Sequence, residues 1–391
     1  MPFLRKRIRD PRGRPPADPG RTGKAALKGY LLLWKLLQEG VETGVFPGAV
    51  VGIRTPDRKV FLTAGYRGLL PRTEENDEDT LYDLASLTKP LATTISVMRL
   101  HGEGRLSLRA PLSCFFPREY FGEKAYLRVT VRDLLSHRGG FPAWRPYFKS
   151  LLALPRTSRR EHLLRLILSE PPVFSPGEGE LYSDLGFFLL GEIVTRVSGR
   201  PLEEYAEESL GKLIPEYAGE LLFRPLDKGI PPRRIAPTER CPFTGRWLRG
   251  EVHDENTRVL GGVSGAAGLF GSARAVLALL EVLLEVWRGR PKGGLSPEIL
   301  RYFWGFRGRG GLRALGFDRP SFRDSSTGPF FPRTALGHLG YTGGAFWLVP
   351  EREVAVVLLS NRVHPSRKNE KIRAFRPRFF SEVALFLRLT G

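Results

Sequence analysis

The spacing of apolar residues divides the chain into strand-forming ends and a helical middle. Residues 48–54 (GAVVGIR) and 59–66 (KVFLTAGY) are typical of two short strands joined by a TPDR turn. Residues 345–362 (AFWLVPEREVAVVLLSNR) predict a second hairpin that turns at PERE. Residues 25–44 predict an amphipathic helix, and residues 378–389 predict a helix that closes the chain.

Between these ends, from about residue 90 to residue 290, the pattern is largely helical, most clearly over 159–170, 184–199 and 273–287. Two hairpins that are distant in sequence bury their apolar faces most economically in one shared antiparallel sheet. We therefore expect an α+β fold, in which the terminal helices flank that sheet and the central helices form an inserted second lobe. A functional site is expected where two such lobes meet.

The chain is strongly basic, but much of the excess charge lies at its two ends. The formal net charge is +20; residues 1–29 carry nine Lys/Arg against two Asp, and residues 361–391 carry eight Lys/Arg against two Glu. A basic tail can bind nucleic acid or anionic surfaces through phosphate contacts. No zinc-finger spacing or RNP-type aromatic signature accompanies these residues, so we favour solvated basic ends over a specific nucleic-acid partner.

The composition, 41% hydrophobic and 26% charged, is that of a folded soluble protein. Cys114 and Cys241 have no disulfide or metal-binding pattern, which fits a reducing compartment. Residues 1–24 are basic without a following apolar segment, and the nearby apolar run at 30–37 is too short to span a bilayer. We therefore expect a basic flexible arm over residues 1–24, no transmembrane segment and a cytoplasmic location.

A candidate nucleophile lies in residues 82–104 (YDLASLTKPLATTISVMRLHGEG). Apolar residues recur there at helical spacing, yet Ser86 and Lys89 occupy the first turn. Positions i and i+3 share one face of a helix, so the Lys89 amine can lie beside the Ser86 hydroxyl. A serine needs a nearby base to become a strong nucleophile, and burial lowers the pKa of a lysine toward the range where it accepts a proton. The alternative is a capped helix with a lysine that reaches solvent.

Three motifs in order resemble those of the serine β-lactamase and penicillin-binding-protein superfamily. YDLASLTKPLATT resembles its active-site helix; YSD at 182–184 stands where the family has Tyr-x-Asn or a variant; and HLG at 338–340 stands where it has Lys-Thr-Gly or His-x-Gly on a strand. Supporting stretches are similar to the branch that contains class C β-lactamases, DD-peptidases and related esterases and amidases. These stretches are 134–142, 250–273 and 356–367.

The resemblance implies a role for each motif residue. Ser86 would be the acylated nucleophile, Lys89 its proton acceptor or electrostatic activator, and Tyr182 the partner general acid/base. His338 would shape the site and contact the substrate. The backbone N–H groups of Ser86 and Tyr341 would form an oxyanion hole, because a tetrahedral intermediate needs two fixed donors.

The resemblance also implies a β-lactamase/transpeptidase-like fold and one catalytic domain over residues 25–391. Its sheet lobe would comprise about residues 25–85 and 260–391, and its helical lobe about residues 86–259. Gly340 belongs to the strand end that would border the substrate.

Two residues depart from the commonest family pattern. Asp184 stands where Asn is commonest, and its carboxylate would tend to hold Lys89 protonated. His338 replaces a permanently charged Lys with a group that titrates near neutrality, so its attraction for a substrate carboxylate would be weaker and pH-dependent. Both changes favour an esterase or amidase with a less anionic substrate over penicillin hydrolysis or DD-carboxypeptidase activity.

Other polar positions have simpler interpretations. His137 ends a predicted helix, where bonding to nearby backbone is favoured over a triad base. His253, Asp254 and Glu255 are adjacent and cannot all point one way, so a structural network that borders the cleft is favoured over a metal or acid–base cluster. GGVSGAAG nearly supplies a G-x-S-x-G elbow, but Ala266 occupies the last glycine position.

The sequence thus predicts a serine hydrolase that cleaves an ester or amide of a small molecule or peptide through an acyl-enzyme on Ser86. Esterase, amidase, β-lactamase and DD-peptidase types all fit this chemistry. No cofactor or metal is expected. The alternative is a catalytically inactive relative that acts as a binding protein, and the substrate, the deacylation base and the oligomeric state stay open.

Overall fold

The structure is a computed structural model that describes residues 8–9, 21–122, 124–308 and 311–389. Most of the predicted arm over residues 1–24 lies outside the described residues. Within it, Ile8–Arg9 forms strand β1, which pairs with β3. Helix α2 begins at Arg21, four residues before the predicted start.

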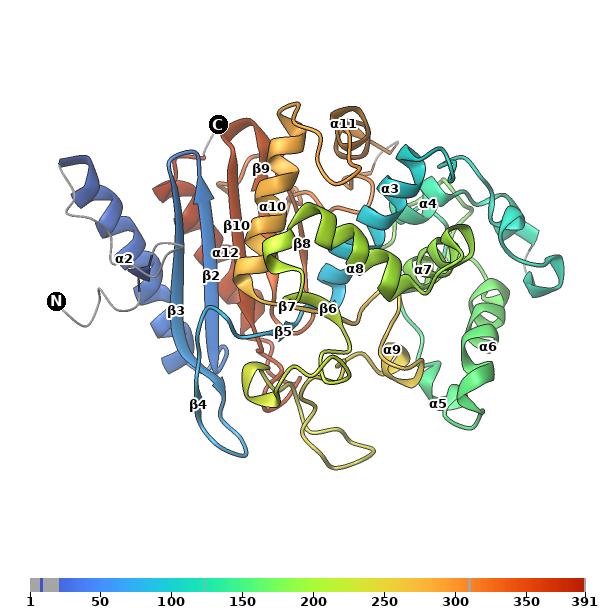
Figure 1. Ribbon diagram of the computed structural model, residues 1–391, viewed down its shortest axis with the longest axis horizontal. Coiled ribbons are helices and arrows are strands. Elements are labelled where there is room, and N and C mark those ends of the chain that lie inside the picture. The colour runs from blue at the N-terminus through green and yellow to red at the C-terminus, as the bar shows by residue number, and fades with distance from the viewer. Residues whose placement is uncertain (1–7, 10–20, 123, 309–310, 390–391) are drawn as a thin grey trace.

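One large antiparallel sheet contains both predicted hairpins (Figure 1). Its strand order is β1-β3-β2-β10-β9-β8, with β4 paired to β3. β2 pairs with β10, placing Val51 opposite Leu358, so the two ends of the chain share one sheet as the sequence predicts. The strands are β1, β2 (Gly48–Thr55), β3 (Arg58–Gly68), β4 (Glu74–Glu75), β8 (Leu336–Leu339), β9 (Ala345–Val349) and β10 (Val354–Ser360).

Helices cover both faces of this sheet, which explains the unbroken apolar runs of its central strands. On one face, α2 (Arg21–Glu42) and α12 (Ile372–Phe386) form a core with side chains such as Val51. On the other face, α10 (Ala273–Trp287) packs against β2 and β10 in a second core that includes Val50. Successive strand residues point to opposite faces, so every residue of β10 is buried.

A second lobe of helices lies beyond α10 (Figure 1). A short antiparallel sheet, β5-β7-β6, connects it to the segment that contains Ser86. Its strands are β5 (Tyr82–Asp83), β6 (Leu221–Phe223) and β7 (Leu269–Gly271). The helices are α3 (Ile95–Gly102), α4 (Val131–Leu135), α5 (Phe148–Leu151), α6 (Arg156–Ser169), α7 (Asp184–Ser198), α8 (Leu202–Leu213) and α9 (Glu255–Val259), and α11 (Pro297–Gly305) packs on α10. The predicted α+β architecture, with helices flanking an antiparallel sheet, is confirmed.

The segment over residues 82–104 differs from the regular helix that its apolar spacing predicts. It begins as strand β5, makes a 3₁₀ turn at Ala85–Leu87, forms a π-helix over Lys89–Thr94 and becomes α-helical only at Ile95. The reason is tertiary, because Tyr82 and Asp83 pair with residues of β7 nearly 190 positions later. Spacing along one segment does not reveal that pairing.

Across the part of the chain that the structure describes, no helix combines the length and apolar character needed to cross a membrane.

Candidate active site

A sharp turn between β5 and the π-helix presents Ser86. Residues 80–98 are all buried except Ser86, which is partly exposed. Ala85 has φ of +47°, a conformation that non-glycine residues rarely adopt, and its N–H donates to Asp83 Oδ1 at 2.8 Å. The Thr88 hydroxyl donates to the Ala85 carbonyl at 2.6 Å. These bonds hold Ser86 as the one partly exposed residue of an otherwise buried segment.

Lys89 is fully buried and contacts Ser86 directly. Its Nζ donates to Ser86 Oγ at 3.0 Å and to the Ala266 carbonyl at 2.9 Å, and Asp184 Oδ1 lies 2.7 Å from it. Burial alone lowers the pKa of Lys89, as the sequence predicts. The negative charge of Asp184 and the Tyr182 hydroxyl outweigh burial, so the pKa of Lys89 lies above its usual value. Burial therefore does not make Lys89 a free amine. The direction agrees with the expectation that Asp184 holds Lys89 protonated, and Lys89 is an ammonium at neutral pH.

Tyr182 is the residue before the N-cap of α7, and its phenol lies beside Ser86 and Lys89. Its hydroxyl interacts with both Lys89 and Ser86, and its ring centroid lies 5.1 Å from Lys89 Nζ. Burial raises the pKa of Tyr182 to about 12, and the neighbouring ammonium offsets only part of that effect. Tyr182 is therefore a neutral phenol at neutral pH, able to donate a proton. The sequence-predicted residues Ser86, Lys89, Tyr182 and Asp184 meet here.

His137 packs behind Tyr182, with ring centroids 4.7 Å apart. Its Nδ1 accepts a hydrogen bond from the Ser183 N–H at 3.0 Å, and its carbonyl accepts one from the Leu181 N–H at 3.0 Å. Burial lowers the pKa of His137 well below its usual value. These bonds agree with the expected backbone role of His137, which positions the residues on either side of Tyr182.

His338 lies on β8 and is also buried. Its Nδ1 is bonded to the Leu339 carbonyl at 2.9 Å, and its ring centroid is 5.7 Å from that of Tyr182. Burial lowers the pKa of His338, and the Lys89 ammonium acts in the same direction against the opposing charge of Asp318. His338 is therefore neutral at pH 7 and supplies no permanent positive charge.

The turn between β8 and β9 is pinned to the segment before Ser86. The Thr342 hydroxyl donates to the Asp83 carbonyl at 2.7 Å. Gly340 approaches so closely that an added Cβ would lie 2.8 Å from the Leu84 carbonyl oxygen. Tyr341 follows Gly340 and is half exposed. The turn thus carries the Tyr341 backbone into the neighbourhood of Ser86.

The residues around His253 form a separate polar network. His253 Nε2 lies 3.1 Å from Glu239 Oε1, and the backbone N–H of His253 donates to Asp83 Oδ2 at 2.6 Å. Asp254 caps α9 by accepting from the Thr257 N–H, and Glu255 pairs with Arg367 at 2.6 Å. The three adjacent side chains point to three different partners, which agrees with a structural loop network. His253 also stacks on Tyr341, with ring centroids 5.6 Å apart.

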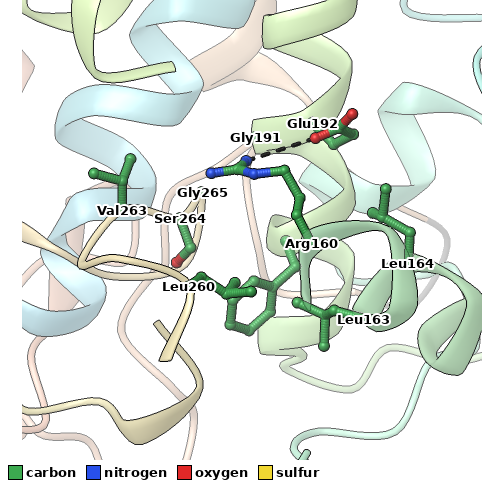
Figure 2. Close-up of a pocket in the computed structure, with 10 residues that line it drawn as sticks. Arg160, Leu163, Leu164, Gly191, Glu192, Leu260, Val263, Ser264 and Gly265 are labelled. Atoms are coloured by element: carbon green, nitrogen blue, oxygen red, sulfur yellow. Dashed lines mark ion pairs between the residues drawn. The ribbon is translucent and has the colours of Figure 1, made fainter. Parts of the chain in front are cut away.

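Sequence reasoning missed the turn over residues 264–266, which holds Lys89 through the Ala266 carbonyl. The sequence feature that could have indicated this turn is the glycine-rich stretch GGVSGAAG, which also resembles a nucleophile elbow. Figure 2 shows a pocket on this turn, bordered by Gly265, Leu163 and Val263, with Arg160 reaching toward Glu192. The pocket contains none of the predicted site residues. Gly265 has no room for a side chain, because an added Cβ would lie 2.0 Å from the Phe187 carbonyl oxygen.

Among the described residues, no group of three or more His, Cys, Asp or Glu side chains has an arrangement that could hold a metal ion.

Comparisons with known proteins agree with the resemblance seen in the sequence. A family model described as Beta-lactamase matches residues 33–376. The chain is 30% identical over 357 residues to an N-acetylmuramyl-L-alanine amidase of Bacillus subtilis (strain 168), covering 84% of this chain and 80% of that protein. It is 34% identical over 310 residues to an Escherichia coli O157:H7 protein named "Putative D-alanyl-D-alanine carboxypeptidase", covering 73% and 70% of the two chains.

The fold is similar to that of the octameric penicillin-binding protein homologue from Pyrococcus abyssi. The TM-score is 0.68 at 22% identity, and the alignment covers 92% of this chain and 77% of that one. At this level of identity the likeness concerns the fold alone.

Proposed function

The chain belongs to the beta-lactamase family and is a serine hydrolase, and from this premise we propose that it acts through an acyl-enzyme on Ser86. The observation that carries the proposal is the convergence of Lys89 and Tyr182 on the hydroxyl of one partly exposed serine. Ser86 is the nucleophile, and the N–H groups of Ser86 and Tyr341 form the oxyanion hole, with Gly340 beside them.

The charges around Ser86 support a specific path for its proton. Ser86 Oγ attacks the substrate carbonyl carbon, and its proton moves to Lys89 Nζ while Lys89 passes a proton to Asp184 Oδ1 across the 2.7 Å ion pair. Tyr182, a neutral phenol, protonates the leaving group as the acyl–Ser86 ester forms. The proton on Asp184 then returns through Lys89 to Tyr182, so these three groups regain their starting states while Ser86 carries the acyl group. Water releases the acid in a second step of the same kind.

The side chains near Ser86 favour an ester or amide substrate of low negative charge. The neutral His338 offers no fixed positive charge to a substrate carboxylate. The amidase relative favours an amide among the small-molecule and peptide substrates that the sequence leaves open. The domain division at residues 25–85, 86–259 and 260–391, the border role of His253, the cytoplasmic location and the lack of a nucleic-acid partner stay predictions.

A substrate panel tests the proposed function. Chromogenic esters, D-alanyl peptides and β-lactams are incubated with the wild type, with Ser86→Ala and with Ser158→Ala, a matched change at an exposed serine of α6. We expect ester or amide turnover that is lost only in Ser86→Ala. Turnover that survives in folded Ser86→Ala would contradict the proposal, and a wild type that turns over no substrate would support an inactive binding protein.

A further inference from the structure

Arg376, on α12, is a buried cation that has no carboxylate partner within the described residues. One of its nitrogens, Nη2, donates to the Gly340 carbonyl at 2.8 Å and to the Gly344 carbonyl at 2.7 Å. Burial, aided by the charge of Arg362, lowers the pKa of Arg376 to about 9, so the guanidinium is still charged at neutral pH. A buried charge without a counter-ion is costly, and two carbonyl groups of a turn could be satisfied by neutral donors.

The Gly340 carbonyl belongs to the same peptide group as the Tyr341 N–H. A cation on the oxygen of a peptide draws electron density toward it and makes the N–H of that peptide a stronger donor. Within the described residues the Gly340 oxygen also accepts from the Gly343 N–H at 3.1 Å, whereas the Tyr341 N–H has no hydrogen-bond acceptor. The polarised N–H is therefore free to donate to a ligand.

Arg362 holds the next peptide of the same turn. Its Nε donates to the Tyr341 carbonyl at 2.8 Å, and its guanidinium lies 4.4 Å from the centroid of the Tyr341 ring. Its Nη1 is fixed by the carbonyls of Arg367 and Asn369 at 2.9 and 2.7 Å. Two guanidinium groups thus clamp the peptides on either side of Tyr341. A developing negative charge near the Tyr341 N–H would give both cations a counter-charge that no described residue supplies in the resting protein.

We propose that Arg376 is a positioning residue of the oxyanion hole, which aligns and polarises the Tyr341 N–H through the Gly340 carbonyl. The inference rests on the proposed function, because it needs an acyl transfer at Ser86. Its effect appears in the transition state, where the substrate oxygen carries negative charge, and hardly at all in substrate binding.

The test compares Arg376→Met, Arg376→Lys and Arg378→Met, a control at an exposed arginine of the same helix. Each variant is assayed with the preferred ester of the wild type and with its thiono analogue, in which sulfur replaces the carbonyl oxygen and accepts hydrogen bonds poorly. For Arg376→Met we expect kcat on the oxygen ester to fall about 10-fold, a fraction of the 10²–10³ attributed to a whole oxyanion donor, with KM changed less than about twofold. The rate on the thiono ester should fall much less.

Arg376→Lys keeps the positive charge and N–H donors, so we expect it to retain most of the wild-type kcat and the wild-type oxygen-to-sulfur rate ratio. A purely structural role predicts equal losses on both esters. Equal losses, or a wild-type kcat in folded Arg376→Met, would overturn the proposal. If Arg376→Met does not fold, an unchanged rate ratio in Arg376→Gln, which keeps a neutral donor, would overturn it equally.

The two proposals fail in different ways. If wild-type turnover does not need Ser86, the proposed function itself is wrong. If turnover needs Ser86 but the oxygen-to-sulfur ratio is the same in wild type and in the variants of Arg376, only the role of Arg376 is wrong.

Discussion

Two groups of charged residues share Asp83, and they differ in what their charges can do. In the first, Lys89 divides its donors among Ser86, Asp184 and a backbone carbonyl, and Ser86 is partly exposed. In the second, His253 and Arg367 both bind Glu239. Asp83 binds the Ala85 N–H with one oxygen and the His253 N–H with the other. The two groups are therefore neighbours on one structural frame.

The difference shows why a cluster of titratable groups is not by itself a catalytic site. Each carboxylate around His253 is already paired with a cation or an N–H group of the protein. These carboxylates therefore hold the fold together and are not directed at a nucleophile. The cluster at Ser86 has a partly exposed serine and a chain of proton carriers that ends on its hydroxyl. Changes in the first group should reduce activity, and changes in the second should reduce stability.

The largest expected effect follows the removal of the Lys89 charge. Lys89→Met fills the same buried volume without an ammonium, so we expect kcat/KM to fall about 10³-fold or more, in line with the loss of an acid–base group that also orients the nucleophile. Stability should fall as well, because Lys89→Met leaves the Asp184 carboxylate without its cation, and removing one partner of a buried ion pair is destabilising. Steady-state kinetics and thermal unfolding measure the two effects. A variant that keeps more than a tenth of wild-type activity would remove Lys89 from the mechanism.

The next effect concerns the second group. Hydrogen bonds from His253 and Arg367 overcome the opposing effect of burial and hold the pKa of Glu239 at about 2, below its ordinary 4.5. A carboxyl with a depressed pKa stabilises the fold above about pH 4.5, and that contribution disappears as the pH falls toward 2. We expect Glu239→Gln to lower the free energy of unfolding at pH 7 by about 2 kcal/mol, with kcat changed less than about threefold.

Urea unfolding at several pH values measures this prediction. The stability difference between wild type and Glu239→Gln should shrink as the pH falls from 4.5 toward 2. If Glu239→Gln loses activity but keeps its stability, the claim that the residues around His253 serve the fold and not the reaction is wrong.

The smallest expected effect concerns His338, at the edge of the first group. Because burial lowers its pKa, His338 gains a proton only below its usual value of 6.5, so KM for substrates with a free carboxylate should be constant above that pH and fall below it. His338→Lys should gain a few-fold in affinity for substrates with a free carboxylate. Equal KM values of wild type and variant for carboxylate and ester-blocked substrates would contradict a substrate contact at this position.

The sequence predicted the large sheet well because each hairpin of the sheet can be recognised from residues that are close together along the chain. Each hairpin shows its own apolar runs and its own turn, and burial on both faces leaves only one economical way to pair β2 with β10. It predicted helix α7 equally well, since Ser183 caps its start and Gly199, with φ of +72°, ends it.

The features that the sequence did not predict depend on contacts between residues that are far apart along the chain. The 3₁₀ and π geometry around Ser86 depends on the pairing of β5 with β7, and the Ala266 acceptor of Lys89 lies 177 residues from it. The sequence indicated two opposing effects on the pKa of Lys89, burial and the charge of Asp184. Which effect is larger depends on the 2.7 Å distance between the two side chains, which the sequence does not show. No sequence motif contains Arg376, and its link to the proposed oxyanion hole is shown only by its hydrogen bonds to the Gly340 and Gly344 carbonyls.

The most direct test of the central claim is mass spectrometry of the intact protein after brief incubation with an ester that deacylates slowly. We expect one added acyl group, located on Ser86 by peptide mapping, in the wild type and in Glu239→Gln, and none in Ser86→Ala. An acyl group on another residue, or one that persists in folded Ser86→Ala, would contradict the central claim.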